Sequence, residues 1–186
     1  MKRRWLEVTL AAAGILFLSK AAWDIYRYRS FQHRLLFGHP VVQSAASSNA
    51  SEHASGEPAM IGQLSVPRLR ILAAVVEGDD ENSLDVAVGH IKGTALFGSR
   101  GNAVVAGHRD TVFWPLRNIR RGDHILVSTG RKYVYSVEQT QIVDPDDTRT
   151  LQDTDTAILT LVTCYPFRHV GPSPKRFVVV AKLLGS

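Results

Sequence analysis

The sequence of 186 residues contains a single cysteine, Cys164, which follows a run of β-forming residues near the C-terminus. A lone thiol cannot form an internal disulfide, and without a second cysteine it cannot build a thiolate zinc cage. Two roles remain. Free cysteine is among the most buried residue types and can pack inertly, whereas an activated thiolate is a nucleophile. The residues that accompany Cys164 decide between these roles.

A long apolar run is also missing near the N-terminus, where Val8–Ser19 is only twelve residues without a charge. The stretch from Trp5 to Trp23 is longer and would span about 28 Å as a helix, enough to cross a bilayer if Lys20 snorkels toward the headgroups. Basic residues on both flanks leave its orientation open. We expect an uncleaved membrane anchor rather than a signal peptide, because the sequence after Ser19 is a poor cleavage site.

The positive charge gives little support for a nucleic-acid partner. The formal net charge is +5, but seven of the 22 basic residues flank the apolar segment outside the expected folded domain. They are Lys2, Arg3, Arg4, Lys20, Arg27, Arg29 and Arg34. This placement suits attraction to anionic lipid headgroups better than a groove for phosphates, so we expect a membrane partner and no nucleic acid.

Low-complexity sequence is confined to one stretch, in which small polar residues dominate from Ser44 to Ala59. Such residues cannot bury enough apolar surface to fold, so the stretch is interpreted as a tether. The sequence therefore predicts three parts: a membrane anchor with a juxtamembrane helix at 1–40, a flexible linker at 41–59 and a folded domain at 60–186.

No ten-residue helical pattern alternates with strands in the folded domain, which argues against a doubly wound α/β sheet. Short runs rich in Val, Ile, Leu and Tyr are separated instead by Gly, Pro, Asp and Asn. The predicted strands are Ile61–Val66, Ile71–Val76, Ala103–Ala106, His124–Ser128, Lys132–Val137, Thr140–Val143, Ala157–Val162 and Arg176–Leu183. Eight short strands predict an all-β, closed or nearly closed barrel, with helical turns at Asn82–Val88 and Phe113–Ile119.

Two histidines that follow glycines are candidates to act with Cys164. His108 comes after an apolar run and so lies at a strand end, as Cys164 does, whereas His90 follows a predicted helical turn. Arg176 opens another β-rich run. A cysteine, a histidine and an arginine at strand ends can supply a nucleophile, an acid/base and an oxyanion stabiliser. The structural alternatives are an inert thiol, a satisfied histidine and a surface ion pair; Arg109 is expected to cap the turn after His108.

Three segments resemble the motifs of the sortases, which are membrane-anchored cysteine transpeptidases. They are 106–110 (AGHRD), 163–167 (TCYPF) and 175–178 (KRFV), in the family's order of His, Cys and Arg. The segments 89–95 and 121–123 add to the resemblance, which covers 61–184 and is strongest for class D and the single sortases of Gram-negative bacteria. It implies an eight-stranded β-barrel, in agreement with the strands counted from the pattern.

Carried over residue by residue, the resemblance implies that Cys164 is the nucleophile, His108 the acid/base and Arg176 the oxyanion or substrate-backbone ligand. His90, Thr163 and Tyr165 are expected to neighbour the site or contact substrate. The implied activity is that of a thiol peptidase and transpeptidase. It cleaves an LPXTG-like C-terminal sorting signal through an acyl-thioester and transfers the protein to an amine acceptor on the cell envelope or on another protein.

The resemblance also implies a single-pass protein of the cytoplasmic membrane with its catalytic domain on the extracytoplasmic side. No cofactor or metal is expected, and the acidic residues Asp144, Asp146 and Asp147 are interpreted as a turn.

Two alternatives remain open from the residues alone. An L,D-transpeptidase also uses Cys, His and Arg, but its arginine usually lies very near the cysteine, whereas Arg176 is twelve positions after the thiol. A non-catalytic, membrane-tethered β-domain that binds a surface partner would have an ordinary or buried Cys164.

Overall fold

The computed structural model describes residues 14–20, 22–23, 26, 59–169 and 171–185. Residues 14–20 are helical, and in this described part no helix has the length and apolar character needed to cross a bilayer. The start of the predicted anchor Val8–Ser19 and nearly all of the predicted linker at 41–59 lie outside the described residues. The anchor, the linker and the division of the chain into three parts therefore stay predictions.

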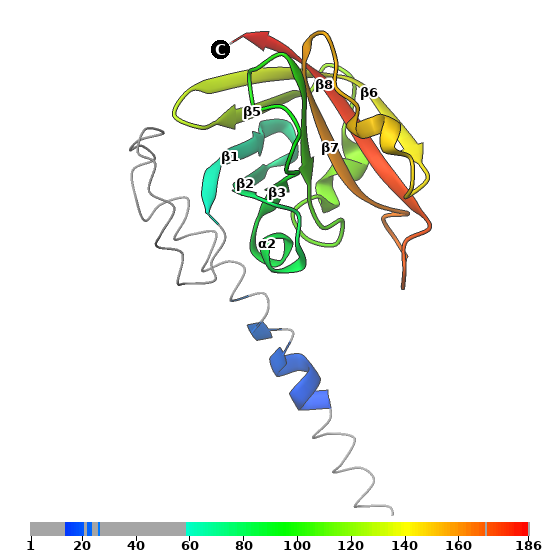
Figure 1. Cartoon of the computed structure of the whole chain (residues 1–186). Coiled ribbons are helices and arrows are strands. Elements are labelled where there is room, and N and C mark those ends of the chain that lie inside the picture. The colour runs from blue at the N-terminus through cyan, green and yellow to red at the C-terminus, as the bar shows by residue number, and fades with distance from the viewer. Residues whose placement is uncertain (1–13, 21, 24–25, 27–58, 170, 186) are drawn as a thin grey trace, which may run out of the picture.

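Eight strands form a closed barrel in the order β1-β2-β3-β4-β7-β8-β6-β5 (Figure 1). The strands are β1 Met60–Val66, β2 Ile71–Glu77, β3 Val88–His90, β4 Gly101–Ala106, β5 His124–Ser128, β6 Lys132–Val143, β7 Ala157–Tyr165 and β8 Lys175–Gly185. One α-helix and three 3₁₀ turns connect them: α2 Glu81–Val86, η1 Pro67–Leu69, η2 Trp114–Asn118 and η3 Thr148–Leu151. The predicted all-β barrel with short helical turns is confirmed.

The strand list differs from the prediction at two places. Val88–His90 is a strand that was not predicted, and it begins at the last residue of the helical turn expected at Asn82–Val88. With three residues it is too short to show a period of two in the sequence. β6 is one strand of twelve residues, not two, and its pairing register with β8 shifts between Val137 and Gln139. This irregularity interrupts the alternation of buried and exposed side chains, so the sequence resembles two strands.

The barrel interior is filled by one apolar cluster drawn from every strand. Tyr135 is fully buried, and its hydroxyl accepts a hydrogen bond from the Gly98 N–H at 2.7 Å. Burial raises the pKa of Tyr135, so the phenol stays protonated at neutral pH. Burying each Leu or Val side chain of the cluster contributes roughly 1.5–3 kcal/mol, so the interior is the main source of stability.

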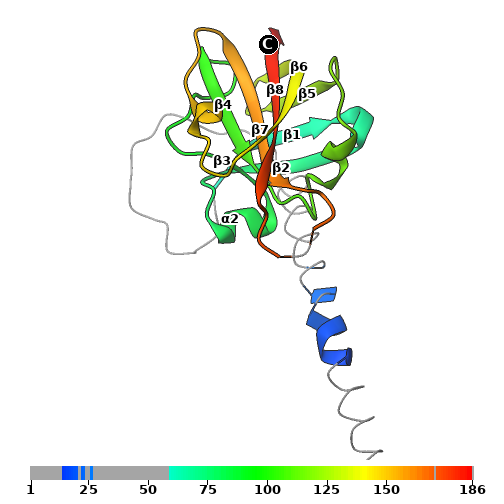
Figure 2. The same ribbon diagram turned by 90° about the vertical axis from the view of Figure 1, so that its right-hand side faces the viewer.

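Three strand pairings place the candidate residues in one row across the sheet. β4 runs parallel to β7, with Ala106 opposite Val162, so the next positions outward bring His108 level with Cys164. β7 is antiparallel to β8, with Cys164 directly opposite Arg176, and Arg176 is opposite Val143 of β6. Figure 2 shows β4, β7, β8 and β6 side by side in this order. Neighbouring strands lie about 4.8 Å apart, so the row is compact.

Candidate functional site

A hollow of about 400 Å³ lies over the end of this row, on the outer face of the sheet. Its floor comes from β4 and β7, and the connection between β6 and β7 covers one side. The lining residues that carry the argument are His108, Cys164, Arg176, Thr163, Val162 and Asp144. The fold thus brings together four of the six site residues predicted from the sequence.

Cys164 is half-buried and is the second-last residue of β7, inside the strand rather than just past its end. Successive strand residues point to opposite faces, and the neighbouring Thr163 is buried, with its hydroxyl donating to the Gly107 carbonyl at 2.7 Å. Cys164 therefore faces outward into the hollow. The strand holds its Sγ in place, and the exposed rim leaves room for a substrate.

His108 is held at the rim by the glycine before it. The Gly107 N–H donates to the Val162 carbonyl at 3.2 Å, which ties this segment to β7. A Cβ at position 107 would lie 2.7 Å from the Phe113 ring, so only glycine allows this close packing. The His108 side chain is 44% exposed, and its Nε2 lies 3.9 Å from Asp85 Oδ1 on α2.

Arg176 faces the thiol from the neighbouring strand. Its Nη1 donates to two backbone carbonyls, those of Ser173 at 3.3 Å and Lys175 at 3.2 Å. Both are long hydrogen bonds, and in the part of the chain that the structure describes the Arg176 guanidinium forms no ion pair with a carboxylate. Its remaining N–H groups are therefore available to an acceptor in the hollow.

Arg109 has a role that sequence reasoning missed. The side chain is 6% exposed and donates to the carbonyls of Pro166 and His169 at 2.9 Å each, and to the Ser173 hydroxyl. All three acceptors belong to the loop that joins Cys164 to Arg176. Arg109 also pairs with its neighbour Asp110, so it ties the His108 segment to this loop rather than only capping a turn. No sequence signal marks it, because two of its partners are backbone carbonyls.

His90 and Tyr165 lie outside the lining of the hollow. His90 is 2% exposed, with Nδ1 2.9 Å from Glu77 Oε2 and Nε2 3.0 Å from the Ala95 carbonyl. Tyr165 packs with Phe167 and Phe177, stacking on the latter with ring centroids 6.4 Å apart. Neither residue lines the hollow, so any contact of either one with substrate stays a prediction.

The acidic residues after β6 form a turn. The Asp147 N–H donates to the Asp144 carbonyl at 3.1 Å, and the Asp147 carboxylate bonds to the Arg149 guanidinium, which lowers the pKa of Asp147. Among the described residues, no group of three or more His, Cys, Asp or Glu side chains is arranged to hold a metal ion.

The sequence of the barrel domain matches that of a known protein family. The family model of the sortase domain matches residues 64–184. Sortase D of Bacillus subtilis (strain 168) is 39% identical over 125 residues, which cover 65% of this chain and 62% of the relative. Sortase A of Listeria monocytogenes is 29% identical over 130 residues, 67% of this chain and 57% of that protein. The match thus spans about three fifths of the length of these relatives.

Solved structures give the same result for the fold. Sortase D5 of Clostridium perfringens, described as a transpeptidase, has a TM-score of 0.62 at 28% identity, over 68% of this chain and 79% of that one. Sortase C1 of Streptococcus agalactiae has a TM-score of 0.64 at 28% identity, over 68% of each chain. The identity to sortase D supports the resemblance to class D that the motifs indicated, and the L,D-transpeptidase alternative is excluded. The chain belongs to the sortase family.

Proposed function

We propose that this protein is a cysteine transpeptidase that cleaves a C-terminal sorting signal and joins the freed acyl group to an amine. The observation that carries the proposal is the row of His108, Cys164 and Arg176, which all line one hollow. A thiol, an imidazole and a guanidinium facing the same space are the groups that acyl transfer through a thioester requires. A non-catalytic binding domain would have no use for this combination.

The reaction begins with attack of the Cys164 thiolate on a peptide carbonyl. The thiolate is the attacking form of a cysteine, and it shares the hollow with His108 and Arg176. The new S–C bond gives a tetrahedral oxyanion; when it collapses, the C–N bond breaks and His108 gives its proton to the departing amine. His108 then takes a proton from the incoming amine as that amine attacks the thioester and the thiolate leaves. Water completes the same step more slowly.

Arg176 has the geometry to stabilise the oxyanion or to hold the substrate backbone. Arg176 lies directly opposite Cys164 on the neighbouring strand and lines the same hollow, and only its Nη1 makes hydrogen bonds among the described residues. Donors fixed in advance at the place where negative charge develops stabilise the transition state more than the ground state.

The substrate class follows from the family. We expect a substrate protein with an LPXTG-like signal and an acceptor amine on the cell envelope or on a second protein. We also propose that the segment around Val8–Ser19 anchors the chain once in the cytoplasmic membrane, with the catalytic domain on the extracytoplasmic side. Sortases as a family act at the cell surface, where both reactants are found.

The test is to trap the acyl-enzyme. Full-length protein in detergent is incubated with a set of Leu-Pro-Xaa-Thr-Gly peptides, and intact-mass spectrometry measures the adduct on Cys164. Cys164→Ala is expected to abolish both the adduct and cleavage with an unchanged unfolding midpoint. Arg176→Lys keeps the charge but not the planar donor fork, and it should slow thioester formation about 10²-fold. More than a trace of cleavage by Cys164→Ala would contradict the mechanism.

A further inference from the structure

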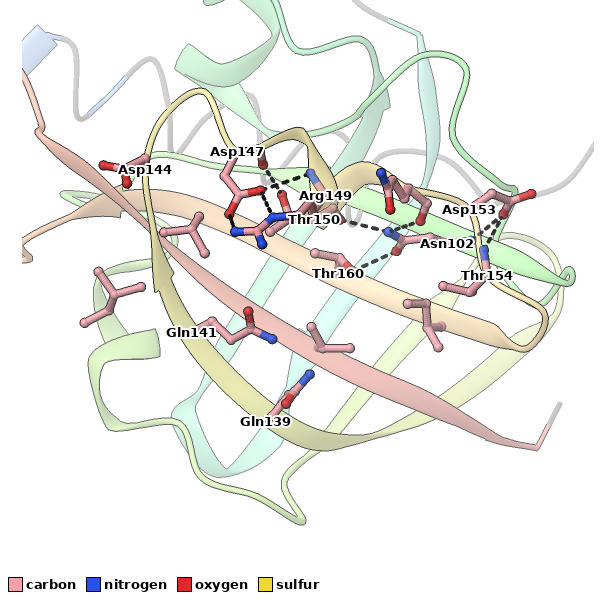
Figure 3. Close-up of a pocket in the computed structure, with 15 residues that line it drawn as sticks. Asn102, Gln139, Gln141, Asp144, Asp147, Arg149, Thr150, Asp153, Thr154 and Thr160 are labelled. Atoms are coloured by element: carbon pink, nitrogen blue, oxygen red, sulfur yellow. Dashed lines mark hydrogen bonds and ion pairs between the residues drawn. The ribbon is translucent and has the colours of Figure 1, made fainter.

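A second and larger hollow, of about 600 Å³, lies on the outer face of the same sheet (Figure 3). Its floor is built from Ile158 and Thr160 of β7, Val180 of β8, and Gln139 and Gln141 of β6. The connection between β6 and β7, which contains η3, arches over one side of it. Nothing in the proposed chemistry of Cys164 uses this space.

The two hollows adjoin each other at this connection. Val143, Asp144, Asp147 and Thr150 line both of them. The outward-facing residues of β7 also lead from one to the other: Cys164 and Val162 line the first hollow, and Thr160 and Ile158 line the second. A chain bound at Cys164 can therefore continue along β7 into the second hollow.

The spacing of β7 indicates which part of a substrate would arrive there. Thr160 lies four residues from Cys164, about 13 Å along a strand, and Ile158 lies six residues away, about 20 Å. An extended peptide advances at a similar rise per residue. If its scissile carbonyl is at Cys164, the residues about four to six positions away lie over the second hollow.

The direction in which the substrate peptide passes Cys164 follows from the proton that the leaving amine must receive. His108 lies on the β4 side of Cys164, so the leaving half of the scissile bond must face β4. The acyl half then leaves Cys164 on the β8 side of β7. On that side β8 and β6 provide Val180, Gln139 and Gln141 to the second hollow, which Asn102 of β4 borders on the other side. The part of the substrate that reaches this space is thus the part that precedes the scissile bond.

The chemistry of the lining favours an uncharged polypeptide. Its carboxylates are already satisfied: Asp144 pairs with Lys175 at 2.6 Å, Asp147 with Arg149, and Asp153 accepts from the Asn102 N–H at 3.1 Å. The amides of Gln139 and Gln141 point into the hollow and make no hydrogen bond within the described part of the chain (Figure 3). Each offers two donors and an acceptor, which match the N–H and C=O groups of an extended backbone.

We propose that the second hollow is a subsite for the extended, polar segment of the substrate protein that precedes its sorting signal, held through backbone contacts with Gln139 and Gln141. The proposal rests on the proposed function of Cys164. It adds a binding contribution beyond the signal itself, so substrates with an extended segment before the signal would be preferred over those with a folded domain at that point.

The experiment compares two peptides with the same cleavable signal. The short peptide begins at the first residue of the best-cleaved Leu-Pro-Xaa-Thr-Gly sequence, and the long peptide carries six Ser, Asn and Thr residues before it. Full-length enzyme is expected to have a KM about tenfold lower for the long peptide, the effect of two or so net hydrogen bonds. The double variant Gln139→Ala/Gln141→Ala should bring the ratio of the two KM values close to one.

Thr140→Ala is the matched control, because Thr140 lies between the two glutamines on the opposite face of β6 and does not line the hollow. It should keep the wild-type ratio. Equal KM values for the two peptides in the wild-type enzyme, or an unchanged ratio in the double variant, would overturn the subsite. If the double variant raised only the KM for the acceptor amine, the proposed subsite would also be overturned, and the hollow would be a site for the acceptor. Cleavage of the short peptide tests the function of Cys164 separately.

Discussion

Two glycine-histidine segments, at the ends of neighbouring strands, place their histidines in opposite environments: one is buried and the other is exposed. His90 ends β3, opposite the core residue Val105, and is 2% exposed, whereas His108 lies beyond the end of β4 and is 44% exposed. The ring nitrogens of His90 contact Glu77 and the Ala95 carbonyl. Those of His108 have no partner closer than Asp85 at 3.9 Å among the described residues. The first ring is a fixed part of the interior, and the second is free to exchange a proton.

The glycines also differ in what they permit. A Cβ at Gly89 would lie 2.0 Å from the Gly78 carbonyl oxygen, so this glycine allows two backbone segments to meet. Gly107 instead makes room for the Phe113 ring. The same dipeptide therefore serves backbone packing at one place and presents a side chain at the other. Only an imidazole ring without fixed hydrogen-bond partners can transfer a proton to or from the substrate. Four predictions test this comparison of His90 and His108.

The largest effect is expected for His108→Ala. Removing a positioned proton-transfer group should lower kcat about 10²–10⁴-fold. The free energy of unfolding should change little, because the side chain is half-exposed and makes no short hydrogen bond. Steady-state kinetics measures kcat, and urea denaturation measures the free energy of unfolding. An equal loss of kcat for His108→Ala and His90→Ala would contradict the difference between the two histidines.

The next effect concerns Arg109, which positions the segment after His108. Arg109→Lys keeps the charge, but one ammonium cannot reach both the Pro166 and His169 carbonyls. We expect kcat to fall about tenfold with a smaller change in KM, because the loop between Cys164 and Arg176 loosens. The pH-rate profile should shift as well, since the surroundings of the thiol change.

Arg68→Lys is the matched control for this variant. Arg68 donates to Asp123 and to the Asn118 carbonyl at 2.6 Å, and it does not line the hollow. The Arg68→Lys variant should be less stable than the wild type, whereas its kcat and pH-rate profile should be unchanged. If both variants lower kcat equally, Arg109 acts only through stability.

His90→Ala is expected to show the opposite balance. Loss of a buried ring with contacts to Glu77 and the Ala95 carbonyl should lower the free energy of unfolding by about 2–4 kcal/mol. Well below the unfolding temperature, kcat should stay within about tenfold of the wild type, since the hollow does not include this residue. Thermal unfolding and steady-state kinetics at one low temperature measure the two effects. A stable variant with a large loss of kcat would place His90 in the chemistry.

The smallest effect is expected for Asp123→Asn, which should change stability at a place remote from both histidines. The Arg68 guanidinium and the Arg120 N–H hold the pKa of Asp123 below its ordinary value. A depressed carboxyl pKa stabilises the fold at pH values above the unfolded pKa of about 3.9, and this contribution is lost as the pH falls. Asp123→Asn should lower stability at pH 7 by no more than about 1 kcal/mol, because Arg68 is exposed and solvent screens the pair. The difference from wild type should shrink toward pH 3, and a constant difference would contradict this account.

Much of the molecule could be predicted from the residues alone. Alternating β-branched residues and the glycine, proline and aspartate breaks between them predicted a barrel of short strands without long helices, because side-chain period and turn chemistry are local properties. They missed the three-residue β3 and divided β6 in two. The uniqueness of Cys164 and the three motifs indicated the family. Glycines before both histidines marked positions of close approach, but not which partner approaches.

The tertiary structure decided which of these residues meet. Pairing of β4 with β7 and of β7 with β8 brings His108, Cys164 and Arg176 into one row, and this register depends on contacts between strands far apart in the sequence. The same is true of Arg109, two of whose partners are backbone carbonyls of a distant loop. It is also true of the second hollow, which forms where the β6–β7 connection crosses the sheet. Burial of His90 likewise follows from strands on both sides of it. Backbone acceptors and burial carry no sequence signature, because every residue has a carbonyl and only the assembled fold excludes water.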